Sequence, residues 1–235
     1  MISREQSLRL QNPNSKYPYF RTDEVELLWN ALIKRKVGAK RTINYVKRYE
    51  FLCKVLLYTG ARIDEVLPAR DFSYKRKVKT KKGIRTRTVN ALNTSGLRPK
   101  DFDLETGVVH MITLKQKGEN ESRSIPIRPE LRDAFQSYLL EYGIPVRSEV
   151  PLFPMRRQTV EDWLKALGEE IGVRIHPHKF RHTFGHTAAR SGIYPGTLKE
   201  WMGHSNIGNT MVYFKVTGEQ TRAEMMQMKF GESID

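Results

Sequence analysis

The sequence contains one cysteine, Cys53, and no long uninterrupted apolar run. A single cysteine forms no disulfide within the chain and supplies no cysteine-rich zinc site. No stretch approaches the roughly 20 apolar residues of a membrane-spanning helix, and residues 1–20 lack the apolar segment of a secretory signal peptide. These absences exclude a disulfide-stabilised scaffold and a membrane protein, and predict a cytoplasmic location.

Acidic residues are few beside the basic ones. The chain has 41 lysines and arginines against 26 aspartates and glutamates, a net charge of +15. Eleven basic residues and one acid, Asp71, lie between Arg70 and Lys100. Such an excess is typical of a protein that binds a polyanion, and nucleic acid is the expected partner.

The 235 residues fit one main domain, because no internal repeat and no Gly/Ser linker divides them. Residues 1–18 lack apolar periodicity and are predicted to be an arm or tail. Apolar residues recur at helical spacing over much of the remainder. The predicted fold is mainly α-helical with a small antiparallel β-hairpin.

The hairpin is predicted from two β-type runs, Val108–Leu114 and Ser122–Ile127, which a polar turn with Gly118 and Asn120 joins. Helices are expected from Thr22, over Thr42–Tyr58 before Gly60, from Ile63, and over Pro129–Tyr142, Thr159–Ile171, Pro177–Ser191, Pro195–Met202 and Asn206–Lys215.

Five of the six histidines lie between positions 176 and 204. His182 and His186 are four apart, as zinc ligands on a helix often are, but no HExxH pattern or cysteine ligand accompanies them. They are interpreted as helix-packing residues, and no metal site is expected. His178 and Arg181, near a helix N-terminus, are suited to binding a phosphate. The alternative is that His178 caps the helix and Arg181 pairs with a surface carboxylate.

Five motifs follow one another along the chain: TGARIDEVL at 59–67, a hairpin with Lys117, HKFRH at 178–182, MGHSN at 202–206 and NTMVYFKV at 209–216. In this order they resemble the catalytic domain of the tyrosine recombinase (phage integrase) family, over about residues 19–216. The resemblance implies an enzyme that cleaves and rejoins double-stranded DNA through a 3′-phosphotyrosine, without metal, ATP or another cofactor.

The resemblance also implies a role for each matching residue. Tyr213 would be the nucleophile, and Arg62, Arg181 and His204 would stabilise the charge that gathers on phosphorus. His178 is the candidate for the phenolic proton. The remaining assignments are Lys117 as acid for the departing 5′-oxygen, with Lys115 as the fallback, and Glu65 as the support of Arg62.

The chain departs from the family in two places. Eighteen residues before Tyr19 are too few for the family's N-terminal DNA-clamping domain, so the chain is either a fragment or a single-domain member. A segment of about thirty residues, rich in lysine and arginine, is inserted at about 70–96, with β-type alternation at Ile84, Thr86 and Thr88. This insertion is interpreted as an arm that binds the DNA backbone, with a solvated disordered loop as the alternative. Its candidate DNA-binding residues are Lys75, Arg76, Lys77, Lys79, Lys81, Lys82, Arg85 and Arg87.

Residues 217–235 form a tail with an apolar strip of Met225, Met226, Met228 and Phe230. The resemblance implies that the tail docks on a neighbouring protomer and builds a homotetramer on DNA, from a monomer or weak oligomer without it; packing within its own chain is the alternative. Two other functions stay open: relaxation of supercoils, as by type IB topoisomerases, and non-catalytic regulation by DNA binding. The target site and the outcome (integration, excision, resolution or inversion) are not specified.

Overall fold

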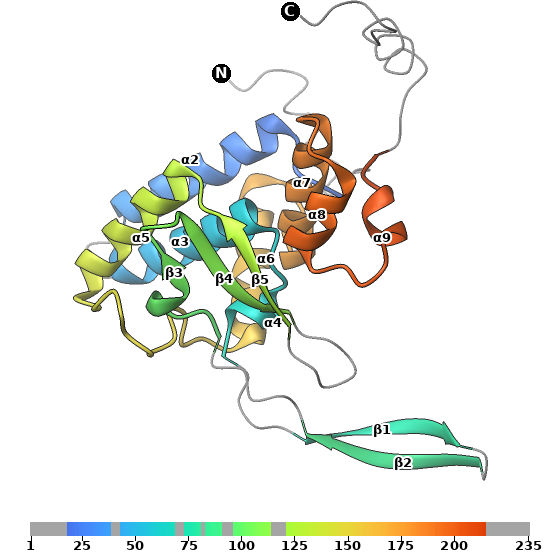
Figure 1. Ribbon diagram of the computed structural model, residues 1–235. Coiled ribbons are helices and arrows are strands. Elements are labelled where there is room, and N and C mark those ends of the chain that lie inside the picture. Colours follow the sequence, from blue (N-terminus) through green and yellow to red (C-terminus); the bar gives the residue numbers. More distant parts are fainter. Residues whose placement is uncertain are drawn as a thin grey trace, which may run out of the picture.

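The computed structural model describes residues 18–38, 43–68, 73–80, 83–90, 96–113 and 121–214. Helices pack around a main hydrophobic core, and a small sheet covers part of it (Figure 1). The helices are α2 (Thr22–Gly38), α3 (Ile43–Thr59), α4 (Ile63–Val66), α5 (Pro129–Tyr142), α6 (Arg157–Ile171), α7 (Pro177–Arg190), α8 (Pro195–Met202) and α9 (Gly208–Met211).

Helix α3 lies at the centre of the core and contacts α2, α5 and α7. Its sequence is apolar around most of its circumference, so Tyr49, Leu52, Cys53 and Leu56 are all fully buried. The helix ends at Gly60, whose φ of 62° is the left-handed conformation that glycine adopts most readily. The chain can then turn sharply into α4, which carries Arg62 at its N-terminal end.

The sheet next to the core has the order β3–β4–β5, with all pairs antiparallel. Its strands are β3 (Phe102–Asp103), β4 (Val108–Thr113) and β5 (Glu121–Pro126). Alternate residues point inward: Val109 and Met111 from β4, and Ile125 from β5, are buried. Arg123 occupies an inward position of β5 as well, opposite Met111.

Helices α7, α8 and α9 lie side by side at one end of the molecule (Figure 1). Pro177 and Pro195 stand in the first turns of α7 and α8, where a missing backbone N–H leaves no helical bond unmade. Helix α8 ends at Gly203 in the left-handed conformation. The chain then passes through His204 to α9 and back across α7.

The basic insertion forms a second sheet, in which β1 (Ser73–Thr80) pairs antiparallel with β2 (Gly83–Asn90). Figure 1 shows this hairpin apart from the helical body. The register places Arg76 opposite Arg87, and Lys77 opposite Thr86. Lys81 and Lys82 lie outside the described residues.

The prediction of a mainly helical fold with a small antiparallel sheet is confirmed. The two-stranded hairpin has a third strand, β3, whose two residues are too few to give a β-type pattern. The last helix is shorter than predicted: α9 spans Gly208–Met211, where the sequence predicts Asn206–Lys215. Asn206 instead accepts a hydrogen bond from the Gly208 N–H with its side chain, which places it in a turn before the helix.

Candidate active site

Arg62 and Glu65 form the N-terminal turn of α4. The Arg62 backbone N–H donates to Glu65 Oε2 at 2.8 Å, and Arg62 Nη1 donates to Oε1 at 3.0 Å. The Glu65 side chain is fully buried, whereas that of Arg62 is 33% exposed. Glu65 therefore holds the Arg62 guanidinium from its buried side, and Arg62 remains partly exposed at the surface.

Glu65 has a second arginine partner, Arg123 from β5. Arg123 Nη2 donates to Glu65 Oε2 at 2.7 Å, and Nη1 donates to Oε1 at 3.3 Å. Burial by itself raises the pKa of Glu65, but Arg123, through charge and hydrogen bonds, and Arg62 outweigh it. The pKa of Glu65 therefore lies below its ordinary value, and the buried carboxylate is ionised at neutral pH.

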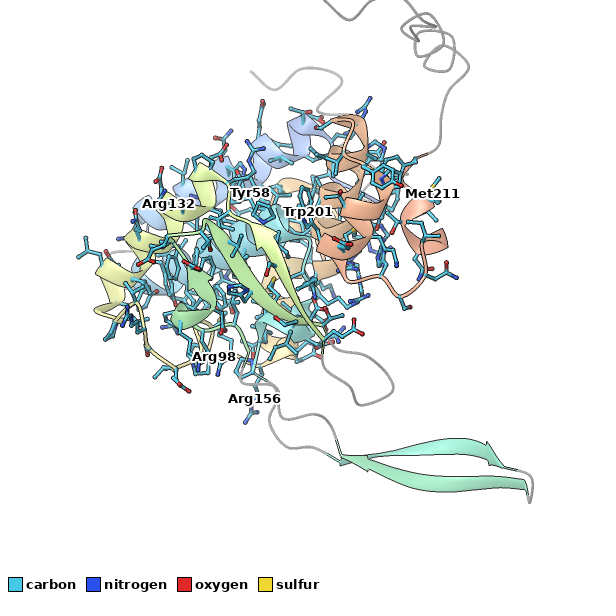
Figure 2. All side chains as sticks on the ribbon, in the orientation of Figure 1. Tyr58, Arg98, Arg132, Arg156, Trp201 and Met211 are labelled. Atoms are coloured by element: carbon cyan, nitrogen blue, oxygen red, sulfur yellow. The ribbon has the colours of Figure 1, made fainter. Side chains whose placement is uncertain are left out.

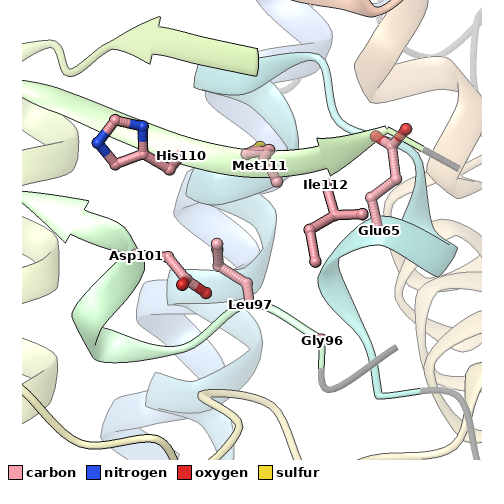
Figure 3. A pocket seen from close by; sticks show the side chains of 7 residues that line it. All are labelled: Glu65, Gly96, Leu97, Asp101, His110, Met111 and Ile112. Atoms are coloured by element: carbon pink, nitrogen blue, oxygen red, sulfur yellow. The ribbon is translucent and has the colours of Figure 1, made fainter. Parts of the chain in front are cut away.

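A small cavity lies beside Glu65, between α4 and β4. Figure 3 shows Glu65 reaching from α4 toward the end of β4, with Ile112 next to it. The cavity holds about 10 Å³, which is about the smallest space that can hold one water molecule. Glu65 is thus enclosed, and its carboxylate acts on neighbouring side chains rather than on a ligand.

Arg181 projects from α7 and is 5% exposed. Its Nη1 donates to the Gly60 carbonyl at 2.7 Å, and Nη2 donates to the Met202 carbonyl at 2.6 Å. Burial, and then the charge of Arg62, lower the pKa of Arg181 to about 10, so it is charged at neutral pH. These bonds fix its guanidinium between the end of α3 and the end of α8.

His204 follows the left-handed turn at Gly203. Its Nδ1 lies 2.8 Å from the hydroxyl of the buried Thr210. Burial, followed by the charges of Arg181, Arg62 and Arg123, lowers the pKa of His204 to about 4. The ring is therefore neutral at neutral pH, and Thr210 fixes its orientation.

Tyr213 lies just after α9, and its ring packs against Gly185 of α7. A methyl group on Gly185 would come within 2.7 Å of that ring. Tyr213 Oη lies 3.2 Å from His182 Nδ1. Burial raises the pKa of Tyr213, while the charges of Arg181 and Arg62 lower it. The phenol therefore stands within electrostatic reach of both arginines.

An open cleft of about 570 Å³ runs between the β4–β5 hairpin and the segment from α8 to Ser205. Its lining is polar and includes Arg123, Lys199 and His204. Figure 2 shows Met211 of α9 at the outer edge of the molecule. Of the candidate residues, His204 lines this cleft.

The structure brings together most of the residues that the sequence predicts. Arg62, Glu65, Arg181, His204 and Tyr213 act on one another by hydrogen bonds or charge. The loop 114–120, with Lys117 and Lys115, lies outside the described residues, as does the tail 217–235.

The histidine positions agree with the sequence interpretation only in part. His178 is exposed, and His182, interpreted as a helix-packing residue, is the one that contacts Tyr213. His186 stacks on Tyr19 with ring centroids 3.8 Å apart, which agrees with a packing role. The sequence analysis did not predict a role for Arg123. The sequence does show that this arginine alternates with the inward-facing residues of the predicted strand.

In the described part of the chain, no three histidine, cysteine or acidic side chains are placed to hold a metal ion. Within the same residues, no helix is long and apolar enough to cross a membrane.

Sequence comparisons give a match over more than half of the chain. A profile described as the phage integrase family matches residues 91–220. The chain is 32% identical over 146 residues to tyrosine recombinase XerA of Thermococcus kodakarensis, covering 59% of this chain and 50% of that one. It is 27% identical over 211 residues to tyrosine recombinase XerA of Saccharolobus solfataricus, covering 89% and 59%. The chain thus spans between 50% and 59% of the length of these relatives.

Solved structures share the fold. The crystal structure of XerA recombinase superposes with a TM-score of 0.57 at 20% identity, over 93% of this chain and 68% of that one. The Tn1549 transposon integrase, solved in complex with circular intermediate DNA, gives a TM-score of 0.59 at 23% identity, over 90% and 66%.

Proposed function

Because the chain belongs to the phage integrase family of tyrosine recombinases, we propose that it cleaves and rejoins double-stranded DNA through a 3′-phosphotyrosine on Tyr213. One observation carries the proposal: Tyr213 lies within electrostatic reach of the guanidinium groups of Arg62 and Arg181. A phenol needs such a positive field to act as a nucleophile at neutral pH.

In the proposed reaction, Tyr213 Oη forms a bond to phosphorus while the bond from phosphorus to the 5′-oxygen breaks. Arg62 and Arg181 neutralise the charge that develops on the non-bridging oxygens, and His204 adds a hydrogen bond. The phosphotyrosine retains the energy of the cleaved linkage, so religation requires no ATP.

Two proton transfers complete the step. The phenolic proton passes to a histidine, and His182 is the nearer candidate because its Nδ1 lies 3.2 Å from Tyr213 Oη; exposed His178 is the second. The pKa of His182 is lowered by burial and by the charges of His178 and Arg181, so its ring is neutral and able to accept a proton. Lys117, or Lys115, protonates the departing 5′-oxygen.

The partners follow from the same proposal. The β1–β2 hairpin, with Lys75, Arg76, Lys77, Lys79, Arg85 and Arg87 on its strands, binds the DNA backbone together with Lys81 and Lys82. Recombination of two sites requires two duplexes, so a homotetramer assembles on DNA, with residues 217–235 exchanged between protomers. The chain covers 50% to 59% of the length of its XerA relatives.

The test is covalent capture of nicked duplexes that tile the DNA next to the gene, in EDTA and without nucleotide. We expect a protein–DNA adduct from the wild type and none from Tyr213→Phe. Tyr194→Phe is the matched control, because Tyr194 is a 74% exposed tyrosine on the neighbouring loop.

The outcomes separate the alternatives. Salt-sensitive DNA binding without any adduct would favour a regulator that retains the fold. Adducts at many unrelated sequences, with relaxation of supercoiled plasmid, would favour a topoisomerase. Adducts confined to one site, with strand exchange between two copies of it, support the recombinase.

A further inference from the structure

Arg123 is a buried arginine in the middle of a strand, where a charged side chain is stable only with several partners. Its side chain is 7% exposed. Besides its two bonds to Glu65, Nε donates to the Trp201 carbonyl at 2.8 Å and Nη1 donates to Thr113 Oγ1 at 2.7 Å. Four hydrogen bonds thus engage a guanidinium that has five N–H groups.

These four bonds join three segments that carry the proposed reactive groups. Glu65 belongs to α4, which presents Arg62. The Trp201 carbonyl lies at the end of α8, three residues before His204. Thr113 is the last residue of β4, where the loop with Lys117 begins.

The approach of α8 to the hairpin is close. A methyl group on Gly203 would lie 2.9 Å from Thr113 Oγ1 and 3.1 Å from Arg123 Nη1. Small movements of Arg123 therefore change the position of the turn that leads to His204.

The charge of Arg123 also contributes to the net charge of the cluster around Glu65. Three arginines, Arg62, Arg123 and Arg181, surround the single carboxylate of Glu65, so the cluster keeps a positive charge. With its N–H groups engaged, Arg123 has little left to donate to a phosphate. Arg62 and Arg181 remain the groups that contact the substrate.

We propose that Arg123 is a positioning residue of the reaction: it holds Glu65, and through Glu65 the Arg62 guanidinium, in the geometry that receives the scissile phosphate. It also holds the base of the β4–β5 hairpin against the end of α8. This inference rests on the proposed function, because it assigns Arg123 a role in DNA cleavage. A purely structural ion pair is the competing interpretation.

The experiment measures three quantities for each variant. They are the single-turnover rate of adduct formation at saturating nicked DNA, the Kd for that DNA, and the urea concentration at the midpoint of unfolding. Arg123→Met is expected to lower the cleavage rate by about 100-fold while Kd changes by no more than about threefold, because the lost interaction acts in the transition state. Arg123→Lys keeps the positive charge beside Glu65 but loses the two-pronged contact, so it is expected to recover only part of that loss, about tenfold.

Arg98→Met is the matched control. Arg98 pairs with Asp101 at i,i+3, with Nη2 3.1 Å from Oδ1, and its backbone N–H bonds the same carboxylate, as Arg62 does with Glu65. It is partly buried but lies outside the cleft. We expect a lower urea midpoint and a cleavage rate within about twofold of the wild type.

The double variant Arg123→Met/Glu65→Gln separates folding from positioning, because it removes both buried charges at once. We expect it to regain most of the urea midpoint lost in Arg123→Met while its cleavage stays slow. A structural ion pair predicts that midpoint and rate recover together.

The pH profile gives a readout that loss of packing does not change. Arg123 lowers the pKa of Glu65, so Arg123→Met should raise the pH below which cleavage falls, and adding Glu65→Gln to Arg123→Met should remove that upward displacement. Besides Arg123, the charged and titratable groups that act on Glu65 or respond to its charge are Arg62, Arg181 and His204.

Two results would overturn the inference. One is wild-type cleavage by Arg123→Met. The other is a loss in which Arg123→Lys is no better than Arg123→Met and the pH profile is unchanged. If the wild type forms no adduct on any tiled duplex, the proposed function is wrong, and this inference is wrong with it.

Discussion

Arg62 and Arg181 carry the same guanidinium in two different settings. Arg181 is nearly buried, with Nη1 and Nη2 on the carbonyls of Gly60 and Met202, so its position is set by backbone. Arg62 is partly exposed and held by one carboxylate. The more exposed of the two is therefore the one whose geometry depends on a neighbouring side chain, Glu65.

His204 makes the stability of the protein depend on pH. Its pKa is about 4 in the folded chain, against an ordinary value of 6.5, because burial and three arginines disfavour the charged ring. As the pH falls from 6.5 toward 4, the unfolded chain takes up a proton that the folded chain does not, so stability falls in that window. His204→Gln should reduce the drop in urea midpoint between about pH 7 and about pH 5.

The pKa values of His176, His182 and His186 are also lowered, chiefly by burial, so they contribute in the same direction and part of the drop remains in His204→Gln. His110→Gln, at an exposed histidine of β4, is the control and should leave the drop unchanged. An identical drop in His204→Gln and the wild type would contradict the assigned cause.

Some of the site could be predicted residue by residue and some could not. Arg62, Arg181, His204 and Tyr213 stand in short motifs, each with a helix or turn signal beside it. The roles of Arg123 and His182 depend on partners 58 and 31 residues away, Glu65 and Tyr213, and no local pattern encodes those pairings. Only the packing of β5 on α4, and of the segment after α9 on α7, reveals them.

At the scale of elements, the sequence predicts long amphipathic helices well. Helices α5 and α8 begin and end where proline and glycine signals place them, at Pro129 and Pro195, and before Gly143 and Gly203. Strand β3 and helix α9 depend instead on tertiary contacts. Two and four residues are too few to show a hydrophobic period in the sequence.

The β1–β2 hairpin is the element with the clearest test. Alternation along paired strands places Lys75, Lys77 and Lys79 at register positions of one face, and Arg76, Arg85 and Arg87 at those of the other. Each phosphate neutralised contributes about 0.9 to the slope of log K against log salt concentration. Replacing residues 72–95 with a short Gly-Ser loop should therefore flatten the slope by several units.

Two triple variants test which face of the β1–β2 hairpin contacts DNA. Replacing Arg76, Arg85 and Arg87, or Lys75, Lys77 and Lys79, with glutamine should lower the slope by about 2–3 for the face that contacts DNA and by about 1 or less for the other face. Filter binding from low to moderate salt measures both. An unchanged slope in the loop replacement would show that the hairpin does not contact DNA.

At the scale of the whole molecule, the structure bears on which protomer supplies the nucleophile. Tyr213 packs on Gly185 of its own α7, and the charges of its own Arg62 and Arg181 act on it. Hydrogen bonds hold the short segment between α8 and Tyr213 in place. His204 contacts Thr210, and the Tyr213 N–H donates to the Thr210 carbonyl at 3.1 Å. A tyrosine held in this way is placed to attack a phosphate bound in its own site.

Cleavage in cis is therefore expected even if a tetramer forms. Mixing Tyr213→Phe with Arg181→Ala should give no adduct above that of either variant alone, because no protomer then contains both groups. If the tyrosine acted in trans, mixed assemblies would pair an intact nucleophile with an intact arginine pocket, and as much as about a quarter of wild-type cleavage would return. Labelling each variant with a tag of different mass identifies which chain carries the DNA.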